Sequence, residues 1–168
     1  SVLITGGAGF IGSNLVHAWR AAGPADRLTV VDAMTYAANV RSLEPLIADR
    51  SIQFVKGDIG DAALMQRLFD ESKFSRVAHL AAESHVDRSI HGPGDFIDTN
   101  INGTYTLLEA ARAYWSVLDP EVKAGFRFHH VSTDEVFGSL GDTGLFAETS
   151  PYQPNSPYSA SKAASDHL

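Results

Sequence analysis

Val2-Leu3-Ile4-Thr5-Gly6-Gly7-Ala8-Gly9-Phe10-Ile11-Gly12 opens the chain with a short apolar run followed by closely spaced glycines. Glycines at 6, 9 and 12 permit a tight turn and let a phosphate approach the backbone. The helix that we expect over 10–22 would present free N–H groups to that phosphate. The stretch predicts a strand, a phosphate-binding turn and a helix, with a purely structural glycine turn as the alternative.

Short runs rich in Val, Ile, Leu and Phe predict further strands along the chain. The expected strands are 2–5, 28–32, 52–55, 76–80 and 126–132. The expected helices are 10–22, 39–48, 61–71, 94–118 and 156–168. Alternation of strand and helix favours parallel pairing, so we predict an α/β fold with a doubly wound parallel sheet of the Rossmann type. The long loop over 135–155 is expected to be functional or mobile.

The composition limits the classes of partner. The chain has 168 residues, a net charge of −7 and no cysteine. The negative charge argues against nucleic acid or an anionic membrane as partner, although a single nucleotide remains possible. No apolar run approaches the roughly 20 residues of a membrane helix, and no signal peptide precedes the first strand. We expect a cytoplasmic protein.

The last expected helix has no glycine cap or terminating proline. We therefore expect residues 1–168 to be an incomplete dinucleotide-binding domain, truncated before a C-terminal substrate-binding domain. Such a fragment is expected to lack turnover.

A carboxylate follows the second expected strand. Asp32 lies about twenty residues after Gly12, where a carboxylate can bind the 2′-hydroxyl of a cofactor ribose. The same charge would repel a 2′-phosphate, and Ala33 offers no compensating base, so NAD is favoured over NADP. Asp58 and Ile59 follow the third strand, where adenine would lie, but Asp58 is equally well explained as a turn residue.

Tyr158 and Lys162 lie four residues apart on an expected helix and therefore share a face. A nearby ammonium group would lower the pKa of the phenol and make it a plausible base for a hydroxyl proton. A surface pair is the alternative. Thr133, at the end of the fifth expected strand, could hydrogen-bond a substrate oxygen beside Tyr158.

Together these motifs resemble the extended short-chain dehydrogenases that act on nucleotide sugars, a family of epimerases, decarboxylases and dehydratases. Within the family, 80–90, 126–131 and 132–138 are most similar to the dTDP-glucose 4,6-dehydratases. Phe137 departs from the pattern, since the family usually has tyrosine there.

The resemblance implies NAD as cofactor and dTDP-glucose as substrate, converted to a 4-keto-6-deoxy sugar by oxidation at C4, loss of water across C5–C6 and hydride return to C6. It assigns Asp134 as the acid for the 6-hydroxyl and Glu135 as the base for the C5 proton. Tyr158 would take the 4-hydroxyl proton, Lys162 would tune Tyr158, and Thr133 would position the 4-hydroxyl. A capping pair on a solvated loop is the alternative for the two carboxylates.

The resemblance also implies contacts with each ligand. Cofactor contacts are expected from Gly6, Gly9, Phe10, Ile11, Gly12, Asp32, Asp58, Ile59, Leu80, Ala81, Ala82, Thr99, Tyr158 and Lys162. Substrate contacts are expected from Ser84 and Thr133. For Ser84 and Thr99, a helix cap or a satisfied loop hydroxyl is the alternative.

Three histidines, His79, His129 and His130, invite a metal-site interpretation, but neighbours on a strand face opposite ways, so core or interface histidines are the better interpretation. The wide apolar surface of 95–118 predicts a homodimer through paired helices, with a fully intramolecular helix as the alternative. Two alternative functions remain, which are another reaction of the same family and a non-catalytic NAD-binding module.

Overall fold

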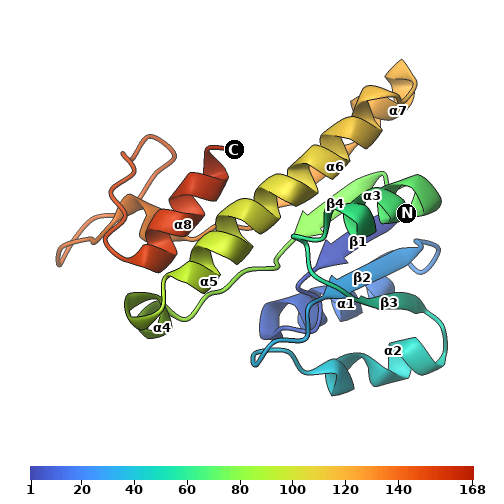
Figure 1. The fold of residues 1–168 in the computed structure, drawn as a ribbon, viewed down its shortest axis with the longest axis horizontal. Helices are drawn as coiled ribbons and strands as arrows, with labels where there is room; N and C mark the ends of the chain where they lie inside the picture. The colour runs from blue at the N-terminus through green and yellow to red at the C-terminus, as the bar shows by residue number, and fades with distance from the viewer. The chain divides into compact units, whose positions relative to one another are not determined.

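The computed structural model describes residues 1–168 and contains one five-stranded parallel sheet (Figure 1). The strands are β1 Val2–Thr5, β2 Leu28–Asp32, β3 Ile52–Lys56, β4 Arg76–His79 and β5 Arg127–His130. Their order is β3-β2-β1-β4-β5. The chain runs outward from β1 to β3 and then returns to place β4 on the other side of β1. This order confirms the doubly wound sheet and makes the carboxyl ends of β1 and β4 the switch point where ligands bind in such folds.

Helices and helical turns connect the strands. The α-helices are α1 Phe10–Ala22, α2 Glu44–Ala48, α3 Ala62–Ser72, α4 Val86–His91, α5 Gly94–Phe96, α6 Thr104–Ser116, α7 Pro120–Gly125 and α8 Pro157–Asp166. Two 3-10 segments span Val40–Leu43 and Asp134–Phe137, and a π-helical segment spans Ile97–Gly103.

The chain divides into two units. Residues 1–81 and 106–131 form the first, which we call the sheet unit, because it holds all five strands. Residues 82–105 and 132–168 form the second, which we call the α8 unit.

Strand β1 explains how the sheet unit buries both faces. Leu3 packs in one cluster with Val31, α3 and Leu107 of α6. Its neighbours Val2 and Ile4 pack in another cluster with Val16 of α1. All four residues of β1, Val2–Thr5, are fully buried, because alternate side chains point to opposite, helix-covered faces.

The structure corrects several expected boundaries. The helix expected over 94–118 consists of α5, the π-helical segment and α6, which ends at Ser116. The helix expected over 39–48 begins as a 3-10 turn, and α2 carries its proline at the helix start, where the missing N–H costs nothing. The fifth strand ends at His130 rather than 132. Helices α4 and α7 and the second 3-10 turn were not predicted.

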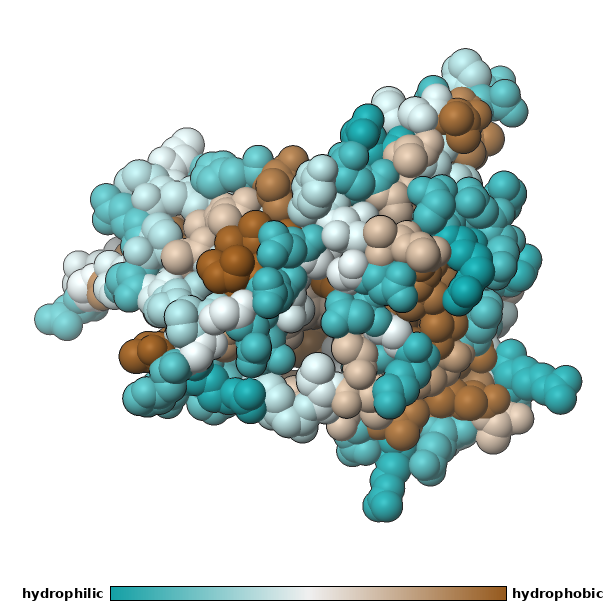
Figure 2. All heavy atoms as spheres, viewed as in Figure 1, coloured by the Kyte–Doolittle hydropathy of each residue, from teal (hydrophilic) through white to brown (hydrophobic).

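No helix in the structure is both long and apolar enough to cross a membrane. Figure 2 shows hydrophilic residues over much of one face, with hydrophobic patches among them. The exposed apolar side chains include Val117, just after α6, and Val122 on α7. Isolated apolar side chains of this kind are normal on protein surfaces.

Candidate active site

The glycine turn after β1 depends on the absence of side chains at two positions. Gly6 has a φ of +68°, and a Cβ there would lie 2.6 Å from the backbone nitrogen of Ala81. A Cβ on Gly12 would lie 2.1 Å from the carbonyl oxygen of Gly6. Neither space admits a larger residue, so the turn and the start of α1 pack backbone against backbone.

The N-terminus of α1 faces outward without a side-chain cap. Gly9 occupies the N-cap position and has no side chain to satisfy the N–H groups of the first turn. Phe10 and Ile11 in that turn are 86% and 67% exposed, which is high for large apolar residues. Free N–H groups and the positive end of a 13-residue helix suit an anionic ligand.

Asp32 ends β2 and is buried, with 8% of its surface exposed. Its Oδ2 accepts a hydrogen bond of 2.9 Å from the N–H of Ala8, and its Oδ1 accepts one of 2.8 Å from the N–H of Met34. The carboxylate is therefore neither a helix cap nor a surface charge, since it anchors the glycine turn to the segment that follows β2. Each carboxylate oxygen has a further lone pair, so a ribose hydroxyl can still donate to it.

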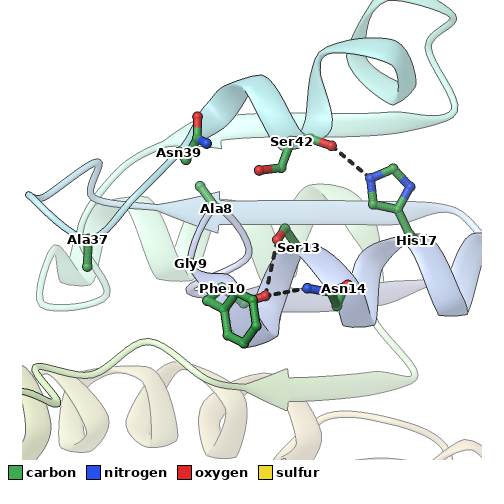
Figure 3. Close-up of a pocket in the computed structure, with 9 residues that line it drawn as sticks. All are labelled: Ala8, Gly9, Phe10, Ser13, Asn14, His17, Ala37, Asn39 and Ser42. Carbon is green, nitrogen blue, oxygen red and sulfur yellow. Dashed lines mark hydrogen bonds between the residues drawn. The ribbon is translucent and has the colours of Figure 1, made fainter.

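A pocket of about 450 Å³ lies beside the glycine turn (Figure 3). It is lined by Ala8, Gly9, Phe10, Ser13, Asn14, His17, Ala37, Asn39 and Ser42. One wall comes from the turn and α1, and the other comes from the chain after β2. The N–H of Asn39 donates to the carbonyl of Ala8, and His17 Nε2 is hydrogen-bonded to the carbonyl of Ser42, which holds the two walls together. The sequence predicted only Gly9 and Phe10 among these residues.

The other expected cofactor residues of the sheet unit differ in their exposure and in their local contacts. Asp58 is exposed, and its Oδ1 accepts the N–H of Gly60, which is the turn role that was the alternative for it. Ile59 packs in the core and is 3% exposed, so only its backbone is available to a ligand. Leu80 and Ala81 follow β4, next to Gly6 at the switch point.

Tyr158 and Lys162 lie one turn apart on α8, as the sequence predicted. The helix starts with a reciprocal cap in which Ser156 and Ser159 exchange side-chain and backbone hydrogen bonds. Tyr158 is half-buried, whereas Lys162 is only 4% exposed. Lys162 is thus a buried amine and not half of a surface pair.

Four of the five expected catalytic residues interact within the α8 unit. Burial raises the pKa of Tyr158, a hydrogen bond with Thr133 opposes that rise, and the charges of Glu135 and Asp134 add to it. Burial lowers the pKa of Lys162 to about 8, and Asp166 counteracts that shift. The pKa of Tyr158 is therefore raised overall and not lowered as expected, because burial is the largest cause and Lys162 is not among the groups that shift it.

Thr133 has a different local role from the one expected. It does not end β5, because the strand stops three residues earlier, at His130. Instead it caps the 3-10 turn Asp134–Phe137, and its Oγ1 accepts the N–H of Glu135 at 3.3 Å. The cap comes from Thr133, so Asp134 is left exposed and Glu135 partly exposed, and neither carboxylate is the capping group.

The sequence did not single out Asn100, which lies in the π-helical segment and is 1% exposed. Its Oδ1 accepts the N–H of Glu83 at 2.8 Å, and its Nδ2 donates to the Glu83 carbonyl at 2.9 Å and to Ser161 Oγ at 2.8 Å. The amide ties the loop that contains Ala82 and exposed Ser84 to α8. An asparagine inside a predicted helix was the available signal, because it disfavours helix interiors.

Two remaining expectations concern aromatic and histidine side chains. Phe137 contacts the rings of Phe146 and Tyr152, at centroid distances of 5.4 and 5.3 Å, so its ring packs in an aromatic cluster of the α8 unit.

In the sheet unit, His79 is 1% exposed, its Nδ1 is hydrogen-bonded to Thr5 Oγ1, and its ring stacks on His130. His79 is therefore a core histidine.

Comparisons with known proteins place this arrangement in a family. Residues 3–168 match the family model described as GDP-mannose 4,6 dehydratase. A dTDP-glucose 4,6-dehydratase of Xanthomonas campestris is 58% identical over 99% of the chain and 47% of its own length. A probable dTDP-glucose 4,6-dehydratase of Sinorhizobium fredii is 56% identical over 99% of the chain and 47% of its own length.

Solved structures agree with these relatives. DesIV, a dTDP-glucose 4,6-dehydratase of Streptomyces venezuelae crystallised with NAD, superposes with a TM-score of 0.87 at 48% identity. That match covers 99% of the chain and 49% of DesIV. The chain therefore spans about half the length of the proteins it matches.

Proposed function

Because the chain belongs to the GDP-mannose 4,6-dehydratase family, we propose that it is part of a nucleotide-sugar 4,6-dehydratase, and that its substrate is dTDP-glucose. The observation that carries this proposal is the group formed by Tyr158, Thr133, Asp134 and Glu135, whose side chains act on one another. A dehydration requires both an acid and a base beside the group that abstracts the first proton, and this unit supplies all three.

NAD fits the residues of the sheet unit. The spaces at Gly6 and Gly12 admit no Cβ, and the uncapped start of α1 offers N–H donors to a pyrophosphate. The buried carboxylate of Asp32 offers an acceptor to a ribose hydroxyl and would repel a 2′-phosphate. Exposed Phe10 and Ile11 would be covered by such a ligand. When bound, the cofactor would accept the C4 hydride as NAD⁺ and return it to C6 as NADH.

The first chemical task falls to Tyr158, which takes the proton of the 4-hydroxyl as C4 is oxidised. Burial and neighbouring carboxylates disfavour its phenolate, so the Thr133 hydrogen bond and a cationic partner must favour it. Lys162, one turn away, is the cation that this chain provides. Thr133 can also hold the substrate oxygen, because its hydroxyl already interacts with Tyr158.

The second task is the loss of water. The 4-ketone acidifies the C5 proton, which Glu135 removes as a general base. Asp134 gives a proton to the departing 6-hydroxyl as a general acid. The two residues are neighbours on a 3-10 turn capped by Thr133, which suits them to act on adjacent carbons of one sugar. An epimerase has no need of this pair.

We also propose a homodimer. Tyr105 and Trp115 on α6 are 54% and 42% exposed, whereas Leu107, Ala111 and Tyr114 on the same helix are buried. The helix thus presents an apolar side chain at two places on its outer surface, which is consistent with pairing of two such helices. The cytoplasmic location stays a prediction from composition.

An isotope experiment tests the reaction. The purified full-length gene product, supplied with dTDP-glucose deuterated at C4, should yield a 4-keto-6-deoxy sugar that carries the deuterium at C6. A Tyr158→Phe variant should lose roughly 10²–10⁴-fold in rate, the usual size of general-base catalysis. Inversion at C4 without loss of water would instead identify an epimerase, and absence of any turnover would contradict the proposal.

A further inference from the structure

Asp166 lies on α8 one turn beyond Lys162 and two turns beyond Tyr158, so the three residues follow one face of the helix. Its Oδ2 accepts a hydrogen bond of 2.6 Å from Ser132 Oγ and another of 3.0 Å from the hydroxyl of Tyr152. Ser132 directly precedes Thr133. The carboxylate therefore joins α8 to the segment that carries the expected catalytic residues.

These contacts close a ring within the α8 unit. Tyr158 leads along α8 to Lys162 and Asp166, Asp166 binds Ser132, and the next residue, Thr133, hydrogen-bonds Tyr158. A ring of this kind fixes the distance between the start of the 3-10 turn and the helix. Asp166 is the one carboxylate in the ring, and its charge also acts on the buried amine of Lys162.

We propose that Asp166 is a positioning residue for the reaction: its carboxylate holds Ser132, and with it Thr133, against α8. The same carboxylate lies one helical turn beyond Lys162, and its charge favours the ammonium form of that amine. This inference rests on the proposed function, because it assigns Asp166 to the machinery of that reaction. It gives a physical reason for a buried lysine to remain charged next to Tyr158, since the burial of Lys162 alone favours the neutral amine.

Other charges near this face do not replace Asp166. Asp134 and Glu135 act on Tyr158 and raise its pKa. The elements packed against α8 bring Asp87, Arg88 and His91 on α4, Asp95 on α5 and Asp98 in the π-helical segment. None of those five is among the groups that shift the pKa of Tyr158 or of Lys162.

The test compares three variants in the full-length protein. Asp166→Asn keeps the shape and an acceptor oxygen but removes the charge, so the alkaline limb of kcat/KM should move to lower pH by roughly 0.2–0.7 pH units, the effect of one partly exposed charge pair. Asp166→Glu should move the limb back. Ser132→Ala removes the hydrogen bond alone, so it should lower kcat without moving the limb. Asp70→Asn, an exposed carboxylate on α3, is the matched charge control and should change neither.

A second measurement separates this inference from the proposed reaction. The ¹⁵N signal of the Lys162 ammonium, assigned with Lys162→Arg, should titrate at lower pH in Asp166→Asn than in the wild type. This readout needs no turnover, so it remains decisive if the wild type does not dehydrate dTDP-glucose. An unchanged Lys162 titration together with an unmoved limb in Asp166→Asn would overturn the role of Asp166.

Discussion

The carboxylate of Asp32 accepts the backbone N–H of Ala8 at 2.9 Å, so the residue expected to recognise a ribose also holds the glycine turn in place. Its second oxygen accepts the N–H of Met34, a residue with a φ of +60°. A substitution at this position therefore changes two things, the ribose acceptor and the turn, and an experiment must separate them.

Replacing Asp32 with Asn should weaken NAD⁺ binding while keeping an acceptor oxygen for one of the two backbone N–H groups. Asp32→Ala removes both acceptors and should also destabilise the fold, by about 1–3 kcal/mol for each buried N–H left unsatisfied, which thermal unfolding without cofactor would detect. Isothermal titration of cofactor-stripped protein would measure the affinities for NAD⁺ and NADP⁺. The ratio of the two affinities, which should favour NAD⁺ in the wild type, should fall in both variants. Equal affinities for the two cofactors in the wild type would show that Asp32 does not select NAD⁺.

Gly12→Ala should abolish cofactor binding or destabilise the sheet unit, because the new Cβ would lie 2.1 Å from the carbonyl of Gly6. The conflict is with backbone atoms, which cannot rotate away. Gly125→Ala is the matched control, since a Cβ there meets nothing within 4 Å. Thermal unfolding with and without NAD⁺ should show a large loss of melting temperature, or of its increase on NAD⁺ binding, for Gly12→Ala and little change for the control. A normal melting temperature and normal affinity in Gly12→Ala would contradict the close packing.

Asn100→Ala should destabilise the α8 unit by about 1–3 kcal/mol, because it removes a buried amide that hydrogen-bonds the backbone of Glu83 and the hydroxyl of Ser161. Asn102→Ala is the control from the same π-helical segment, since Asn102 is exposed and donates to the exposed carboxylate of Asp98. Surface substitutions of this kind change stability by within about 0.5 kcal/mol. Denaturant unfolding of both variants measures the difference, and equal losses would show that the buried amide contributes no special stability.

The fold was largely predictable, because the central strands β1 and β2 are nearly continuous apolar runs, as expected of strands that helices cover on both faces. Val2, Leu3 and Ile4 need no partner-specific information to be recognised as buried. Asn100 was a weak signal for the break in the helix over 94–118, but the break coincides with hydrogen bonds between Asn100 and Glu83, seventeen residues away in the chain. Local propensity carries no signal for a bond of that kind.

The candidate site was predictable where spacing alone defines it, as for Tyr158 and Lys162 on one helical face. It was not predictable where two distant segments meet. Asp166 and Ser132 are 34 residues apart and each is unremarkable in sequence, yet their side chains are 2.6 Å apart. The pocket wall at Asn39 was missed for the same reason, because the segment after β2 has little regular structure to place its side chains.

Lys162 should make the stability of the protein depend on pH. Its pKa is about 8 in the folded state and 10.5 in an ordinary solvated lysine, so between these values the unfolded chain binds more protons than the folded one. Stability from this group therefore rises as pH increases from about 8 to 10.5. Lys162→Met removes the buried charge and should be more stable than the wild type near pH 7. The difference in free energy of unfolding between the two proteins should shrink above pH 8. Denaturant titrations at several pH values test this, and a difference that stays constant would show that Lys162 is not desolvated.

If Glu135 is a base and Asp134 is an acid, substitutions of the two residues should stop the reaction at different steps. Glu135→Gln leaves oxidation at C4 possible but removes the base for C5, so the 4-keto hexose should accumulate and C5 should exchange with deuterated solvent far more slowly. Asp134→Asn leaves that base in place, so C5 exchange should continue while the 6-hydroxyl is retained. If instead the pair only supports the turn, both variants should lose thermal stability and C4 oxidation together. Single-turnover quenching, with mass spectrometry of the sugar in deuterated water, distinguishes the two cases. Exchange at C5 in Glu135→Gln at the wild-type rate would place the base on another residue.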